Sequence, residues 1–267
     1  MKNIKCLSIL CALLLCLFGC VTNELDASGN EVGSSGSGDS HKLSEIYVNL
    51  AVLYQDQGSL TTALERVNMA VRVYSGNPHA YLVRANIYSA IGEASKAEKD
   101  YKKAIRLSSG YYDAQVAYGT FLCSQKKYDL AQTNFNQANS NPLYYNRGLG
   151  FYSKGKCLFE QKQYVTAEDL FKKSLEFQDT PNLVYFYLAS ILLSNDSPDI
   201  ALTYLDKYNG PVNADVLVLR IKILQQLQKA NKYNANNNSS YEDQINLLKK
   251  QLLTNFPSSL AAQNLAQ

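Results

Sequence analysis

The sequence predicts an all-α protein, built as a solenoid of about six helical hairpins. Two observations carry this prediction: small residues recur with a period of 34, and large residues recur at fixed places between them. Three series of small residues show the period: Ala51, Ala85 and Gly119; Ala63, Ala97 and Ala131; and Ala70, Ala104 and Ala138. A period of this length indicates units that stack and bury a continuous core. With 46% hydrophobic residues, the 267-residue chain has enough apolar side chains to form such a core.

Small residues at positions 8, 20 and 27 of a 34-residue period are the signature of the tetratricopeptide repeat (TPR). Helices approach one another most closely at these positions, so only a small side chain fits there. Large side chains are expected to fill the neighbouring gaps at positions 4, 11 and 24. These are Tyr47, Tyr81, Tyr54, Tyr88, Leu122, Tyr101 and Phe135.

The repeats are predicted near residues 44–77, 78–111, 112–147, 148–181, 182–213 and 214–260. A two-residue offset near Asn141 precedes the fourth repeat, in which Gly155 and Ala167 take positions 8 and 20. The sixth is the most divergent, with helices over 214–229 and 241–254 around the polar loop NKYNANNNSS. We interpret it as the cap of the stack, because a terminal repeat of a solenoid meets water on one face.

Residues 1–19 have the form of a secretory signal peptide. Lys2 and Lys5 precede an apolar run that is too short to span a membrane. The run ends in LFGC, which resembles the bacterial lipobox, so Cys20 is the expected acylation site. The alternative is a signal sequence without lipidation. Residues 20–43, rich in Gly and Ser, are expected to form a flexible tether. Because Val21 stands where Asp would favour inner-membrane retention, we expect anchoring at the periplasmic face of the outer membrane.

Charge and cysteine content narrow the function further. Without residues 1–19 the chain keeps 24 basic and 23 acidic residues, which gives no electrostatic footprint for nucleic acid. Beyond Cys20, only Cys123 and Cys157 remain, and an exported protein meets an oxidising compartment. They are one period apart, on first helices predicted to pack side by side. A disulfide between them and two buried free thiols are the two alternatives.

Stacked hairpins form a concave groove, lined mostly by the first helix of each repeat at positions 2, 5, 9 and 12. Its candidate partner-binding residues mix apolar and amide side chains, which suit an extended or helical peptide better than a small metabolite. They are Val48, Val52, Gln55, Leu82, Asn86, Ser89, Val116 and Thr120. The alternative for several of them is packing between repeats.

No motif in the chain predicts catalysis, a metal or a cofactor. The segment from Gly150 to Cys157 matches seven of the eight positions of a phosphate-binding loop, but Cys157 stands where Ser or Thr should bind Mg²⁺. The segment is also predicted to lie inside a helix. The two histidines, His41 and His79, form no cluster with metal-ligand spacing and give neither cysteine a base. A role in binding other proteins is therefore expected, and no enzyme activity.

Two stretches of the sequence are more specific than the general TPR pattern. The third repeat reads AYGTFLC and ends in NPLYY, and the fourth contains KGKCLFEQKQY. Over residues 44–205 the chain resembles the PilF/PilW family of type IV pilus biogenesis lipoproteins, the pilotins. The resemblance implies a right-handed superhelix of six hairpins, anchored in the outer membrane, that helps the pilus secretin reach that membrane and form its ring.

The resemblance also assigns roles to residues of this chain. It puts Cys20 in the position of the lipid anchor, and Cys123 and Cys157 in the family's paired-cysteine positions. It makes the groove of the first repeats the candidate secretin contact. The alternative function is a general cell-envelope TPR scaffold for barrel assembly or peptidoglycan enzymes, which would have no reason to carry the NPLY turn.

Overall fold

A computed structural model describes residues 36–230 and 235–266 of the chain. Within these two ranges the chain forms thirteen helices and no strand. The helices pair into six antiparallel hairpins, and a short last helix follows, so the prediction of an all-α TPR solenoid is confirmed. The pairs are α2 (Gly36–Asp56) with α3 (Leu60–Val73), α4 (Pro78–Ala90) with α5 (Ala94–Leu107), α6 (Tyr112–Ser124) with α7 (Tyr128–Ser140), α8 (Arg147–Glu160) with α9 (Tyr164–Ser174), α10 (Val184–Ser194) with α11 (Pro198–Asp206), and α12 (Ala214–Ala230) with α13 (Ala235–Asn255), followed by α14 (Leu260–Ala266).

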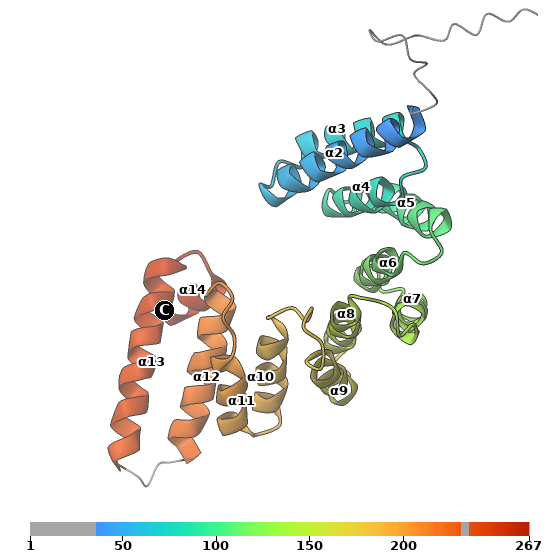
Figure 1. Ribbon diagram of the computed structural model, residues 1–267. Coiled ribbons are helices and arrows are strands. Elements are labelled where there is room, and N and C mark those ends of the chain that lie inside the picture. Colours follow the sequence, from blue (N-terminus) through green and yellow to red (C-terminus); the bar gives the residue numbers. More distant parts are fainter. Residues whose placement is uncertain (1–35, 231–234, 267) are drawn as a thin grey trace, which may run out of the picture.

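The hairpins follow one another along an open arc (Figure 1). The first helices of the central hairpins, α4, α6 and α8, lie on its inner side, and α5 and α7 lie on its outer side. Each core cluster is shared by neighbouring hairpins: Val48 and Val67 of the first hairpin pack with Val83 and Ile87 of the second. Stability therefore comes from contacts between adjacent repeats, as expected for a solenoid.

The small residues of the period lie where the helices meet. Ala85, Ala97 and Ala104 have no exposed surface, and the matching residues of the other repeats are also buried. At Gly119 the approach is closer still, because a Cβ built there would lie 2.8 Å from Cε1 of the fully buried Phe135. Position 8 of the third repeat thus holds a glycine because the ring at position 24 occupies the space of a side chain.

The turns between the two helices of a hairpin share one conformation. A residue with positive φ stands at the same place in each of the first five repeats: Gly58 (75°), Gly92 (81°), Lys126 (59°), Lys162 (61°) and Asp196 (54°). This left-handed conformation reverses the chain tightly, and it is easiest for glycine. The later repeats keep the same turn without glycine, so the stacking of the helices overrides the local preference.

The first helix begins earlier than the period predicts. Helix α2 starts at Gly36, eight residues before the predicted repeat boundary at Ser44, so residues 36–43 are helix and not tether. Ser44 Oγ donates to the carbonyl oxygen of Ala70 (3.0 Å), and the His41 ring packs edge-on against Tyr74 (5.3 Å). These contacts fasten the start of α2 to the end of α3.

The C-terminal hairpin also differs from its prediction. Helix α13 begins at Ala235, six residues before the predicted start, and α14 was not predicted. Asn and Ser disfavour a helix by only a few tenths of a kcal/mol each. The later part of α13 packs against α12, and this packing lets the helix begin within the Asn-rich segment. Ile245 and Leu252 of α13, together with Ala262 of α14, pack against the residues of α12.

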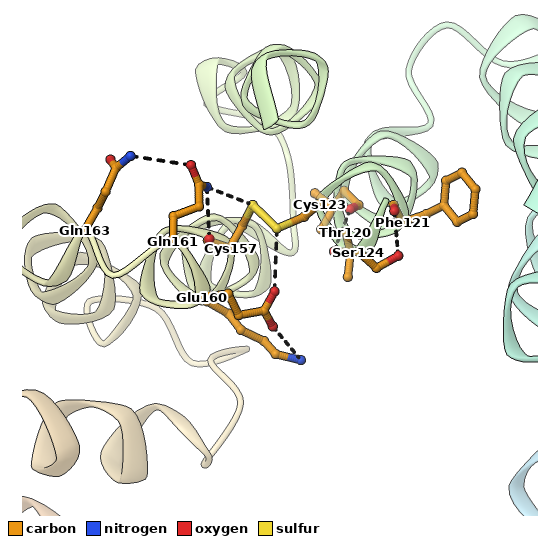
Figure 2. Close-up of a disulfide and its surroundings, with 10 residues drawn as sticks. Thr120, Phe121, Cys123, Ser124, Cys157, Glu160, Gln161 and Gln163 are labelled. Atoms are coloured by element: carbon orange, nitrogen blue, oxygen red, sulfur yellow. Dashed lines mark hydrogen bonds and ion pairs between the residues drawn. A yellow bond between two sulfur atoms is a disulfide. The ribbon is translucent and has the colours of Figure 1, made fainter. Parts of the chain in front are cut away.

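A disulfide joins the third and fourth repeats. Cys123 of α6 and Cys157 of α8 are bonded, with Cα atoms 5.9 Å apart, and both side chains are buried (Figure 2). The Glu160 Oε2 atom lies 3.7 Å from the Cys123 sulfur, a contact and not a hydrogen bond, since a disulfide sulfur has no proton to donate. The bond fixes the distance between two neighbouring first helices.

Substitution of Gly119 tests the close approach of α6 and α7. Gly119→Val is expected to lower the free energy of unfolding by about 1–3 kcal/mol, because the added side chain meets the Phe135 ring. Gly110→Val is the control, since no atom lies within 4 Å of a Cβ at that position. Urea unfolding followed by circular dichroism measures both, and equal stability of the two variants would contradict this packing.

Removal of the disulfide tests its contribution to stability. It closes a separation of 34 residues, so Cys123→Ala/Cys157→Ala is expected to lose about 3–4 kcal/mol in the chain-entropy description. Dithiothreitol should lower the urea midpoint of the wild-type chain and leave that of the double variant unchanged. An unchanged wild-type midpoint under reduction would show that the bond adds no stability.

Candidate functional site

A groove of about 420 Å³ lies between α4, α6 and α8, the helices on the inner side of the arc. It spans the second to fourth repeats. Its wall combines small polar side chains with apolar ones: Asn86, Ser89, Tyr101, Asp113, Val116, Ala117, Thr120, Phe121, Ser124, Leu149 and Ser153.

Half of the predicted groove residues lie together here. Asn86, Ser89, Val116 and Thr120 all line this groove. Val52 and Gln55 belong to α2 and lie beyond the limits of this groove. The Val52 side chain is 36% exposed there.

The assignment of position 5 to the groove needs correction. Val48 has no exposed surface, and Leu82 is 8% exposed and belongs to the core cluster of the second to fourth repeats. Position 5 therefore packs against the next hairpin. Val116, at the same position, is also nearly buried, and it reaches the groove with only a small part of its surface.

The prediction missed the contribution of the fourth repeat. Leu149 and Ser153 of α8 form the far side of the groove, together with Phe121 and Ser124 of α6. Leu149 stands at position 2 of its repeat, so the rule applied to the first three repeats could have found it. Phe121, Ser124 and Ser153 stand at positions outside that rule.

The polar atoms of the groove are largely engaged with neighbours inside the protein. Tyr101 donates its hydroxyl proton to Asn86 Oδ1 (2.8 Å), which leaves the Asn86 amide nitrogen as a donor. Thr120 Oγ1 donates to the Val116 carbonyl oxygen (3.0 Å) and keeps its capacity to accept. Burial raises the pKa of Tyr101 above its usual range, so this phenol stays protonated. The groove thus offers amide and hydroxyl groups beside apolar surface.

The one acidic residue of the groove wall is held by the NPLYY turn. Asp113 Oδ1 accepts hydrogen bonds from the Tyr144 hydroxyl (2.8 Å) and from Asn146 Nδ2 (2.9 Å). Burial raises the pKa of Tyr144 above its usual range, and the Asp113 carboxylate adds to the shift. The Asn141 side-chain amide donates a hydrogen bond from Nδ2 to the Tyr112 hydroxyl oxygen. Its Oδ1 accepts a hydrogen bond from the backbone N–H of Leu143 (2.8 Å). The turn therefore fastens α6 to α8 at one end of the groove.

The disulfide fastens the same two helices farther along. A small hollow beside it, lined partly by Lys156 and Glu160, shares Thr120, Ser124 and Ser153 with the groove. Figure 2 shows Thr120 and Ser124 on the helix of Cys123, and Glu160 on the helix of Cys157. The groove wall formed by α6 and α8 is thus held at two points.

The described residues present no group of three or more His, Cys, Asp or Glu side chains that could hold a metal ion. None of the helices within 36–230 and 235–266 has both the length and the hydropathy needed to cross a membrane. The predicted signal peptide and Cys20 lie outside the described residues.

Comparison with known proteins identifies the repeat and its relatives. Residues 78–111 match the Tetratricopeptide repeat family. The type IV pilus assembly protein PilF of Pseudomonas aeruginosa is 25% identical over 209 residues, which cover 78% of this chain and 81% of that protein.

Two solved structures share the solenoid. The structure of Pseudomonas aeruginosa PilF has a TM-score of 0.68 at 23% identity, over 85% of this chain and 98% of that one. The crystal structure of PilW, described as a widely conserved type IV pilus biogenesis factor, has a TM-score of 0.67 at 27% identity. The match covers 84% of this chain and 98% of that one. In sequence and in its solenoid, this protein is therefore similar to the PilF/PilW TPR proteins.

Proposed function

We propose that this protein is an assembly factor of the type IV pilus machinery that acts by holding another protein. The observation that carries the proposal is the match to a type IV pilus assembly protein over 78% of this chain. Binding, and not catalysis, is the role that a TPR solenoid serves, since its curvature creates an extended concave surface.

The groove between α4, α6 and α8 is the proposed contact site. A volume of about 420 Å³ accepts several side chains of a peptide, and its wall carries no charged side chain except Asp113, which the NPLYY turn already engages. A segment with small apolar and polar side chains fits this surface, because Asn86 and Thr120 can bond its backbone while Val116 and Leu149 contact its side chains. We expect a partner segment without a cluster of charges.

The finer proposal is that of a pilotin. Acylation of Cys20 would anchor the protein at the periplasmic face of the outer membrane, where it would help the type IV pilus secretin to assemble into its ring. The LFGC sequence at residues 17–20 and the resemblance to the PilF/PilW family support this proposal.

Deletion of the gene tests the pilotin role. Without the protein, heat-resistant secretin multimers in outer-membrane fractions are expected to be lost, and wild type should restore them. Cys20→Ala should restore them poorly, because the protein would no longer reside at the membrane. The measurement is an immunoblot of fractionated cells, and normal multimers and pili in the deletion strain would favour the general envelope scaffold instead.

A matched pair of threonine variants tests the groove. Thr120 on α6 and Thr133 on α7 are both exposed, and each donates to the carbonyl oxygen four residues earlier. Thr120→Arg places a charged side chain in the groove and is expected to weaken secretin capture at least tenfold, about 1.4 kcal/mol. Thr133→Arg, on the outer helix, should leave capture unchanged. Equal binding by both variants in a pull-down titration would exclude this groove as the contact.

A further inference from the structure

A row of basic side chains runs along the outer face of α5. Lys99, Lys102 and Arg106 are exposed and Lys103 is half-buried. Ala97, Tyr101 and Ala104 are buried on the opposite face. Residues three and four apart on a helix lie next to one another, so the four cations form one continuous row.

Nearby acidic residues compensate only part of this charge. Glu98 pairs with Lys102 (2.7 Å) and with Lys127 (2.9 Å), and hydrogen bonds from these lysines lower the pKa of Glu98 to about 2. Within the described part of the chain, Lys99, Lys103 and Arg106 have no acidic side chain within ion-pair distance. Three uncompensated positive charges thus lie within about two turns of one helix.

The row borders a hollow of about 500 Å³ with a fixed floor. Arg84 Nε donates to Asp100 Oδ2 (2.6 Å), and its Nη2 donates to Oδ1 of the same carboxylate (3.0 Å). The Tyr81 ring lies beneath the Arg84 guanidinium (5.2 Å) and the Lys103 ammonium (5.6 Å). Because Asp100 is already bonded to Arg84, it is less able to neutralise the cations at the rim.

We propose that the outer face of α5 docks on an anionic phospholipid surface through Lys99, Lys103 and Arg106. Their charge is complementary to the headgroup phosphates, and a helix on the outside of the arc can meet a flat surface. A peptide fits better in the hollow inner face, which this orientation leaves free for the proposed secretin contact.

The position of the row agrees with an N-terminal anchor. Figure 1 shows α5 on the same side of the arc as the start of α2 at Gly36. The sixteen residue steps from Cys20 to Gly36 span at most about 55 Å when the chain is fully extended. If Cys20 is acylated as proposed above, α5 stays within reach of the lipid surface. The electrostatic contact would then add a second attachment to the lipid anchor.

Vesicle partitioning of the chain from residue 20 onward, without acyl groups and with the disulfide oxidised, tests the docking independently of the pilus. Equal parts of phosphatidylglycerol and phosphatidylcholine supply the anionic surface, and phosphatidylcholine alone supplies the neutral one. Each basic residue near an anionic surface strengthens binding about fivefold. The triple variant Lys99→Gln/Lys103→Gln/Arg106→Gln is therefore expected to lose about a hundredfold in partitioning at low salt.

The control removes the same charge elsewhere: Lys222→Gln/Lys249→Gln/Lys250→Gln, in α12 and α13. It should partition like wild type, whereas raising the salt to 0.5 M should release wild type through screening. The proposal is overturned if wild type shows no preference for anionic vesicles, or if both triple variants lose partitioning equally. Binding of polyglutamate without binding of vesicles would assign the row to an acidic protein segment instead, and would also overturn it.

Discussion

The whole structure depends on how closely two helices approach where one of them has almost no side chain. At Gly119 the Phe135 ring fills the space of the missing Cβ, and Phe171 takes the corresponding place against Gly155. The spacing within a hairpin follows from this contact, and the spacing between hairpins follows from the alanines beside it. Since each repeat contacts mainly its neighbours, one local rule repeated through the first five hairpins produces the arc and its hollow inner side.

The sequence predicted the features that this rule controls. The period located the first five hairpins, and it placed the Gly150–Cys157 segment inside a helix, which the structure bears out. It could not locate the start of α2, because His41 and Ser44 are fixed by contacts with residues about thirty positions away. The sequence also could not show that Val48 belongs to the core and not to the groove. A 34-residue period gives the position of a residue in its repeat, but it does not give the angle between that repeat and the next one.

The two sequence stretches on which the resemblance to the PilF/PilW family rests make structural contacts beside the groove. Tyr144 of the NPLYY turn bonds Asp113, and Cys123 of the FLC segment bonds Cys157. The first bond ties α6 to the turn that leads into α8, and the second ties α6 to α8 directly. The motif by which the sequence resembles the PilF/PilW family therefore coincides with the place where two first helices are fastened, and the groove lies between these fastenings.

The disulfide also bears on how a partner is held. In a solenoid, small changes in the angle between successive repeats widen and narrow the groove on the inner surface. A ligand that fits only one groove width binds only the fraction of molecules that have this width. A covalent bond between α6 and α8 removes that freedom at one junction. The entropy of fixing the wall is then lost when the protein is oxidised and folded, before any partner arrives, so less of the binding free energy is consumed by ordering.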